Sequence, residues 1–322
     1  MTTTHPPITV SVPGTCGELV QGWHPDWDVP VLVSCPIELS SRVTVSLRPD
    51  PRLIAPRSGY AKLRQAARLA LTTLNCPQAG ATMNVTSQLK RGRGMASSTA
   101  DVVGALAGLA IALGRPFSPA QLAGLACQIE PTDSVMFAEL AALAYRDGGH
   151  FEIIGPAPAL PLLMLDAGGA VDTLAYNRQL NLSALRALGP TTAEALALLR
   201  QGDPAAIGAA ATLSAVSYQP ILFNPLLAPA QEWAAATGAL GVVRAHSGSV
   251  IGLLYPPGAP LAEPARWLKK QFTGSLTQTR LTPGGVGLEQ ASPAAPETRP
   301  AARAPRYAAP TYQLLEPVES IV

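Results

Sequence analysis

The feature that most constrains this chain is a glycine-rich bend between a predicted strand and a long predicted helix. Residues 82–88 alternate like a strand, Gly92-Arg93-Gly94-Met95-Ala96-Ser97-Ser98-Thr99-Ala100 follows, and residues 96–113 have the Ala, Leu and Val content of a buried helix. Glycines let a backbone approach a ligand closely, and the N–H groups at a helix start attract an anion. The bend therefore predicts a phosphate site, with a glycine turn and a serine N-cap as the structural alternative.

Hydroxyl side chains at the end of this bend add to the prediction. Ser97, Ser98 and Thr99 can bond a phosphate or a bound metal ion. The segment is not a Walker A loop, because no Gly-Lys-Ser/Thr sequence ends it.

A pair of carboxylates lies between two predicted helices, in Glu130-Pro131-Thr132-Asp133-Ser134. One carboxylate can hold Mg²⁺ through its oxygens, and the other can accept or orient the proton of an attacking hydroxyl. The alternative is a plain helix boundary, with Glu130 in solvent and Asp133 as the N-cap of the next helix.

A third segment, Ala245-His246-Ser247-Gly248-Ser249, follows a predicted buried strand. Its small residues allow the chain to pass close to another group. His246 is a candidate general base, although a lone histidine at a turn also fits a structural role. A Ser–His–Asp hydrolase is disfavoured, because the chain has no G-x-S-x-G elbow.

Composition excludes several classes of protein. A hydrophobic fraction of 48% predicts a substantial core, and a net charge of +2 without a dense basic stripe argues against a nucleic-acid partner. The four cysteines include no C-x-x-C pair, which argues against a zinc knuckle. No stretch approaches ~20 apolar residues and the N-terminus lacks a signal peptide, so we expect no membrane partner and a cytoplasmic location.

The order of predicted elements indicates an α+β fold, because strands and helices do not alternate regularly. The segment PGTCGELVQG, residues 13–22, is expected to be a turn between two strands. Residues 291–311 are dominated by Pro and Ala, which indicates a mobile extension. We expect strands at 8–12, 31–36, 41–47, 82–88, 151–154, 160–166, 239–244, 249–255 and 274–280, and helices at 60–75, 96–113, 118–129, 133–145, 183–201, 204–217 and 260–271.

Three segments in this order resemble the three motifs of the GHMP kinases, the superfamily of galactose, homoserine, mevalonate and phosphomevalonate kinases. They are Pro13-Gly14-Thr15-Cys16-Gly17-Glu18, Lys90 through Ala100, and Arg244 through Val250. The resemblance implies a two-lobed fold with a flexible C-terminal tail. Its parts would be a ribosomal S5-like, ATP-binding N-terminal lobe (residues 1–150), a ferredoxin-like C-terminal lobe (151–286) and a Pro/Ala-rich tail (287–322).

Within this superfamily the sequence is most similar to the L-threonine kinases of bacterial cobalamin synthesis. The similarity implies ATP and Mg²⁺ as cofactors and L-threonine as the small-molecule substrate, with O-phospho-L-threonine as product. Three alternatives stay open: another hydroxyl acceptor such as homoserine, a non-catalytic sensor that binds ATP or a metabolite, and a structural protein acting through its tail. A homodimer is also left open.

The resemblance also implies residue roles. Ala96 and Thr99 stand where the family usually has Gly and Ala, so we expect a negative φ at Ala96. Asp133 would orient the acceptor hydroxyl, and Ser98 and Glu130 would hold Mg²⁺, although several superfamily members space these two carboxylates farther apart. The expected ATP-binding residues are Lys90, Arg91, Gly92, Arg93, Gly94, Met95, Ala96, Ser97, Ser98 and Thr99, and the expected substrate-binding residues are Glu18, Gln21, His246, Ser247 and Gly248.

Overall fold

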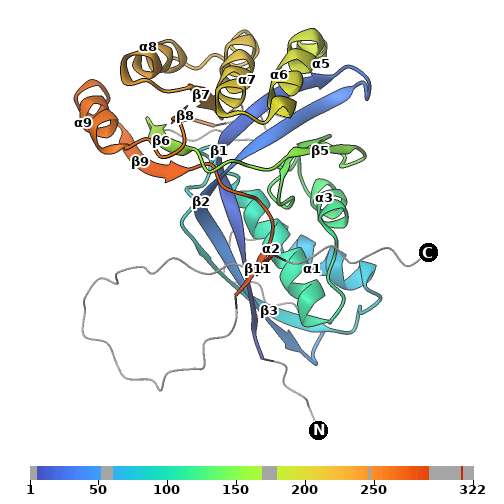
Figure 1. Cartoon of the computed structure of the whole chain (residues 1–322). Helices are drawn as coiled ribbons and strands as arrows, with labels where there is room; N and C mark the ends of the chain where they lie inside the picture. The colour runs from blue at the N-terminus through green and yellow to red at the C-terminus, as the bar shows by residue number, and fades with distance from the viewer. Residues whose placement is uncertain (1–5, 52–60, 169–179, 246–247, 290–312, 315–322) are drawn as a thin grey trace, which may run out of the picture.

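The structure is a computed structural model that describes residues 6–51, 61–168, 180–245, 248–289 and 313–314. Within these ranges the strands join into one antiparallel sheet of 11 strands, on which the helices pack (Figure 1). The hydrogen-bonded order is β5-β4-β2-β1-β7-β8-β6-β9; β3 pairs with β2, and β10 pairs with β1 and with β11 (Gln313–Leu314). This arrangement confirms the predicted α+β class.

A long hairpin of β1 (Ile8–His24) and β2 (Val29–Arg48) forms the axis of the sheet (Figure 1). Register shifts between Pro13 and Val20 bend the hairpin, as β-bulges do. Different strands therefore join its two halves. The first half carries β3 (Gly80–Ser87) and β10 (Gly287–Glu289), and the second carries β4 (Leu140–Leu143) and β7 (Gly241–Arg244).

The glycine-punctuated segment at residues 13–22 lies inside β1, so the predicted turn there is wrong. Gly17 has a φ of 64° at the bulged part of the strand, and pairing with β2 continues on both sides. The chain reverses later, at residues 25–28, where Asp28 has a φ of 53°. Glycine tolerates the positive φ that a β-bulge can require. The glycines thus bend a strand and bring its backbone close to a neighbour.

Three strands extend the sheet beyond β7. In β6 the side chains alternate between two hydrophobic clusters: Leu162 and Met164 face the larger one, and Leu163 and Leu165 face a smaller one. This part of the sheet therefore carries a buried apolar layer on each face. The strands are β6 (Pro161–Asp166), β8 (Val250–Leu254) and β9 (Ser275–Arg280).

One group of helices covers the first half of the hairpin (Figure 1). Gly104 and Gly108 let α2 lie close to β2, since an ideal Cβ at these positions would come within 2.6 Å of Val43 and 2.8 Å of Val45. The predicted N-cap at Ser118 is confirmed, with a complete capping box to Gln121. These helices are α1 (Ala61–Thr73), α2 (Ser97–Ala112) and α3 (Pro119–Cys127).

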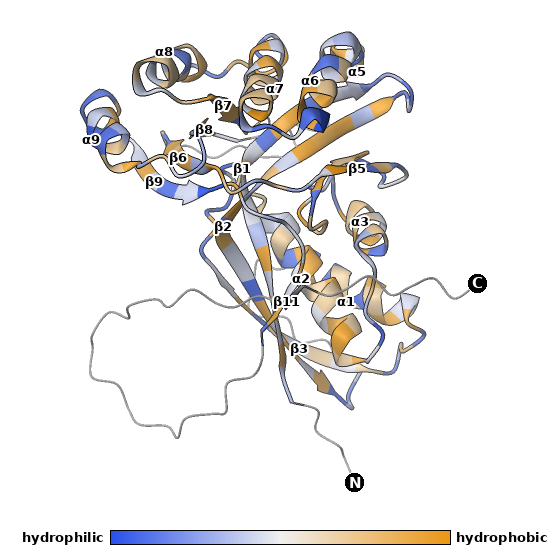
Figure 2. Cartoon of the chain, viewed as in Figure 1, coloured by the Kyte–Doolittle hydropathy of each residue, from blue (hydrophilic) through white to orange (hydrophobic). Residues whose placement is uncertain are grey.

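A second group of helices packs on β1, β7, β8 and β9. In Figure 2 the hydrophobic colour concentrates on the strands and the helix faces turned toward them, whereas α9 is mostly hydrophilic and buries only Ala265 and Leu268. The predicted helix over 183–201 is interrupted before Pro190, which lies at the start of a new helix. These helices are α5 (Leu182–Arg186), α6 (Gly189–Gln201), α7 (Pro204–Ser217), α8 (Leu227–Thr237) and α9 (Ala262–Gln271).

Two further expectations need correction. The helix predicted over 133–145 is wrong, because residues 140–143 form β4 and pair with β2 and with β5 (Phe151–Gly155). Long-range pairing outweighs the weak helical preference of Leu-Ala-Ala-Leu. Residues 287–289, expected in the tail, form β10 against β1.

The structure does not test the predicted domain boundaries or most of the predicted tail. The boundaries at residues 150 and 286 stay predictions, and most of the predicted tail lies outside the described residues. Among the described residues, no helix has the length and apolar character needed to span a bilayer.

The packing of α7 on β7 makes a testable prediction. An ideal Cβ at Gly208 in α7 would lie 2.5 Å from the carbonyl oxygen of Leu240, whereas Gly124 in α3 has open space beside it. We expect Gly208→Ala to lower the free energy of unfolding by about 1–3 kcal/mol through overpacking. The matched control Gly124→Ala should raise it by up to about 1 kcal/mol, because alanine favours a helix. Urea unfolding measures both, and a Gly208→Ala variant as stable as wild type would contradict the close contact.

Candidate active site

The glycine-rich bend is held by backbone bonds to the other two predicted motifs. The N–H of Thr15 donates to the carbonyl of Met95 at 3.1 Å, and the N–H of Gly17 donates to the carbonyl of Gly94 at 3.1 Å. From the third motif, the N–H groups of residues 249 and 250 both donate to the carbonyl of Arg93, at 3.0 and 3.1 Å. Three segments far apart in sequence therefore meet at residues 93–95.

Two glycines make this meeting possible. Gly94 has a φ of 81°, and a Cβ built on it would lie 2.2 Å from the Cβ of Ala245. A Cβ on Gly248 would lie 2.3 Å from the carbonyl oxygen of Arg93. No side chain fits at either position without moving the loop. Gly248 thus acts on the loop, while His246 and Ser247 lie outside the described residues.

The start of α2 corrects one expectation. Ala96, its N-cap, has φ 53° and ψ 25°, so the predicted negative φ is wrong. The left-handed conformation is unfavourable for a residue with a Cβ, and such residues cluster at functional sites. Alanine offers no side-chain acceptor to the first turn of the helix. The N–H groups that begin α2 are therefore suited to bind an anion.

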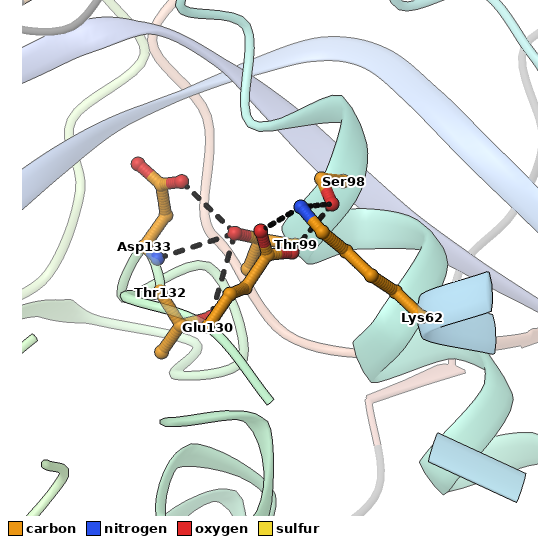
Figure 3. A network of polar contacts seen from close by, with 6 residues as sticks. All are labelled: Lys62, Ser98, Thr99, Glu130, Thr132 and Asp133. Carbon is orange, nitrogen blue, oxygen red and sulfur yellow. Dashed lines mark hydrogen bonds and ion pairs between the residues drawn. The ribbon is translucent and has the colours of Figure 1, made fainter. Parts of the chain in front are cut away.

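Ser98 and Glu130 lie side by side, together with a lysine that the sequence analysis missed (Figure 3). The Ser98 hydroxyl donates to a carboxylate oxygen of Glu130, and the Lys62 ammonium forms an ion pair with the other oxygen. The ammonium also donates to the Ser98 hydroxyl at 3.1 Å. The short spacing of Glu130 and Asp133 therefore does not prevent Glu130 from reaching Ser98.

Asp133 lies on the other side of Thr99 (Figure 3). The Thr99 hydroxyl donates to Oδ2 of Asp133 at 3.1 Å, and the Ser34 hydroxyl reaches Oδ1 at the long distance of 3.5 Å. The backbone N–H of Ser134 donates back to the Ser34 hydroxyl at 2.9 Å. Thr99, which stands where the family usually has alanine, thus orients the carboxylate of Asp133.

The carboxyl group of Asp133 is hard to ionise. Burial is the main cause that raises its pKa to about 7, and the negative charges of Glu18 and Glu130 act in the same direction. The hydrogen bond from Thr99 opposes them, because it stabilises the ionised form. Asp133 therefore exchanges a proton near neutral pH, which suits a group that accepts a proton from a hydroxyl.

The predicted acceptor-side residues lie on β1, and one of them, Glu18, is near this carboxylate. Glu18 and Gln21 are both buried, and Glu18 is close enough for its charge to raise the pKa of Asp133. The amide of Gln21 donates to the Tyr218 hydroxyl at 3.4 Å, and its backbone N–H donates to the Ser214 hydroxyl at 2.9 Å. The register shifts in β1 place both side chains, which sequence alone could not fix.

The basic residues of the bend are engaged in ion pairs. Arg91 lies 3.5 Å from Asp101, while Lys90 and Arg93 lie 3.0 and 3.4 Å from Asp166. Met95 is buried. The sequence analysis assigned no role to either aspartate, because Asp101 follows the second motif inside α2 and Asp166 ends a strand that carries no motif.

A fully buried arginine supports the third motif. Arg244 donates to the side chain of Gln219 and to the carbonyl of Leu222, both at 2.8 Å, and its guanidinium lies over the Tyr218 ring at 5.8 Å. These contacts join the end of β7 to the turn after α7. A buried charge needs such a complete set of partners.

The raised pKa of Asp133 makes a prediction about stability. Because the folded protein holds a proton that the unfolded chain releases near pH 3.8, folding stability falls as pH rises from about 4 through about 7. We expect Asp133→Asn to raise the free energy of unfolding at pH 8 by about 1–3 kcal/mol, since no charge is then buried. The gain should shrink at pH 5.5.

Urea unfolding of the ligand-free protein at both pH values measures this difference. Asp26→Asn, at an exposed turn, is the matched control and should change little at either pH. A loss of stability in Asp133→Asn at pH 8 would contradict the burial of a charged carboxylate.

Comparison with known proteins agrees with this geometry. Residues 61–140 match the family described as GHMP kinases N terminal domain. The chain is 32% identical over 249 residues to the L-threonine kinase of Salmonella typhimurium (strain LT2), covering 75% of this chain and 81% of that protein. It is 31% identical over 290 residues to the L-threonine kinase of Citrobacter freundii, covering 84% of this chain and 91% of that protein.

Solved structures share the fold. The homoserine kinase from Cytophaga hutchinsonii has a TM-score of 0.64 at 16% identity, over 90% of this chain and 99% of that chain. A protein solved in complex with MVAPP, AMPPCP and magnesium has a TM-score of 0.63 at 15% identity, over 88% of this chain and 99% of that chain. At such identities the likeness shows the fold alone. Together with the sequence relatives, it establishes that the chain belongs to the GHMP kinase family.

Proposed function

We propose that this GHMP kinase is an L-threonine kinase, which transfers the γ-phosphoryl group of ATP to the side-chain hydroxyl of L-threonine. One arrangement carries the proposal: the glycine-rich bend, the Ser98–Glu130 pair and Asp133 all border the first turn of α2. The choice of acceptor is supported by the identity of 32% to one L-threonine kinase and 31% to another.

The phosphates of ATP would bind at the start of α2. The carbonyl oxygens of residues 93–95 accept hydrogen bonds from the first and third motifs, which fixes the loop around the helix start. The N–H groups of that first turn, helped by the helix dipole, suit the negative charge of a triphosphate. The side chains of Lys90 and Arg93 would contribute less directly to phosphate binding, because both pair with Asp166.

Ser98 and Glu130 fit a magnesium ion. Their hydroxyl and carboxylate oxygens are the donors that Mg²⁺ prefers, and the Lys62 ammonium already places one positive charge against both. Among the described residues, no group of three or more His, Cys, Asp or Glu side chains could hold a metal alone. When bound beside the phosphates, such an ion would neutralise their charge.

Asp133 is the group that would act on the acceptor. Its carboxylate would orient the hydroxyl and take its proton as the oxygen bonds to the γ-phosphorus and the bond to the leaving ADP oxygen breaks. Thr99 and Ser34 hold the two oxygens of this carboxylate for that task. Positioning of this kind supplies most of the catalysis in phosphoryl transfer, because little covalent work is left to the protein.

An amino-acid acceptor would lie between Asp133 and β1. The buried carboxylate of Glu18 suits the ammonium group of such an acceptor, and the amide of Gln21 can bond its polar groups. The link to cobalamin synthesis stays a prediction from the resemblance.

A panel of acceptors tests the proposed function. We expect ADP release in a coupled assay with MgATP to be fastest with L-threonine and slower with L-serine and L-homoserine. Turnover with L-homoserine alone would keep the kinase but replace the acceptor. No ADP release with any of the three would favour a sensor that binds ATP without turnover.

Substitution of Asp133 tests the mechanism. We expect Asp133→Asn to lower kcat by about 10²–10³, the usual cost of losing one pre-organised catalytic group, because the amide cannot take the hydroxyl proton. AMPPCP affinity, measured by titration calorimetry, should stay within about threefold of wild type, a margin worth less than ~1 kcal/mol. Near-normal turnover would remove Asp133 from the mechanism.

A further inference from the structure

Asp166 is a buried carboxylate at the end of β6, and the activity proposed above does not use it. It lies opposite Val250 in β8 and Ser275 in β9, and its side chain is about 5% exposed. Its place is therefore set by two neighbouring strands. The carboxylate is turned toward the glycine-rich bend, which is far from it in sequence.

Three hydrogen-bond donors and one further cationic side chain surround this carboxylate. Its Oδ2 accepts from the Lys90 ammonium at 3.0 Å, and the Arg93 guanidinium lies 3.4 Å from Oδ1. The N–H of Gly168 and the hydroxyl of Ser249 donate to Oδ1, at 3.0 and 3.3 Å. One side chain thus contacts both ends of the bend and the third motif.

These contacts outweigh the cost of burial. Burial by itself would raise the pKa of Asp166, but the Gly168 N–H and the charges of Lys90 and Arg93 hold the pKa below its ordinary value. The group is therefore ionised at neutral pH. A buried charge that is fully paired restricts its partners to one arrangement, because breaking the pairing leaves the charge without compensation.

The backbone of the same segment carries a second set of links. The carbonyl of Arg93 accepts from the N–H groups of Ser249 and Val250, which begin β8 beside Asp166. Side-chain and backbone bonds therefore join the bend to the same place on the sheet. Lys90 also donates to the hydroxyl of Ser275 at 3.1 Å, which adds β9 to the anchorage.

We propose that Asp166 is a positioning residue that anchors residues 90–94 to β6 and β8, and so holds the start of α2 in the shape that binds nucleotide phosphates. The inference rests on the proposed function for the identity of the ligand. In this arrangement Lys90 and Arg93 act through Asp166, and the phosphates are bound by main-chain N–H groups.

Removal of the Asp166 charge should change the affinity for a polyphosphate, and the direction of that change separates two explanations. On charge alone, removing an anion beside a phosphate site would strengthen the binding of a polyphosphate. If Asp166 instead shapes the loop, its removal weakens binding, because the N–H groups are no longer held in place. Asp166→Asn removes the charge at constant size and separates these two cases.

Titration calorimetry with AMPPCP and Mg²⁺ on the full chain is the first measurement. We expect Asp166→Asn to weaken binding about tenfold, as is usual for coupled neighbours, and Asp166→Glu to recover part of the loss. Adding Lys90→Met to Asp166→Asn should cost nothing further, although Lys90→Met alone weakens binding. Glu38→Gln, which breaks a surface ion pair with Arg280, is the control and should bind like wild type.

Hydrogen–deuterium exchange of the ligand-free protein is the second measurement. Peptides that span residues 89–97 should exchange faster in Asp166→Asn than in wild type or Glu38→Gln. If Asp166→Asn does not fold, the same two measurements are made on Lys90→Met, because the Lys90 side chain is half-exposed.

The outcomes separate the inference from the function on which it rests. Wild type that fails to bind AMPPCP overturns the proposed function, and the inference with it. Wild type that binds while Asp166→Asn binds equally well or more tightly overturns the inference alone. Fully additive effects of Asp166→Asn and Lys90→Met also overturn it, because Lys90 would then contact the phosphates directly.

Discussion

The crossing of three backbone segments at residues 93–95 is the constraint on which the site depends. The carbonyl groups of the glycine-rich bend accept hydrogen bonds from β1 and from the start of β8. Glycines at positions 94 and 248 are required because any side chain there would occupy the space of the neighbouring backbone. With the carbonyls bonded in this way, the start of α2 can present N–H groups to an anion.

Electrostatics divides the site into two halves around Thr99. On one side the Lys62 ammonium compensates the charge of Glu130, and the Ser98 hydroxyl donates to the same carboxylate. On the other side, burial and then the negative charge of Glu18 raise the pKa of Asp133 to about 7. The same sequence segment therefore supplies one carboxylate that is paired with a lysine and one that can exchange a proton near neutral pH.

The sequence predicted the parts of this site better than their geometry. The bend, the two carboxylates and the third motif were singled out from their residues, and the structure brings residues 93–95, Glu130, Asp133 and residues 248–250 to the start of α2. Lys62 and Asp166 were missed, since a lysine at a helix start or an aspartate at a strand end carries no local signal. Their roles come from partners 68 and 76 residues away, which only folding brings near.

Some features of the fold follow from local sequence, and others depend on contacts between distant segments. Local chemistry by itself determined the α+β class, the capped start of α3 at Ser118, the buried helix α2 and the glycine-rich bend that precedes it. Only the tertiary structure decided that residues 13–22 continue a strand, that residues 140–143 form β4 and that Ala96 is left-handed. Strand pairing and loop packing act between distant segments, so their energies outweigh local preference and cannot be read from one stretch of sequence.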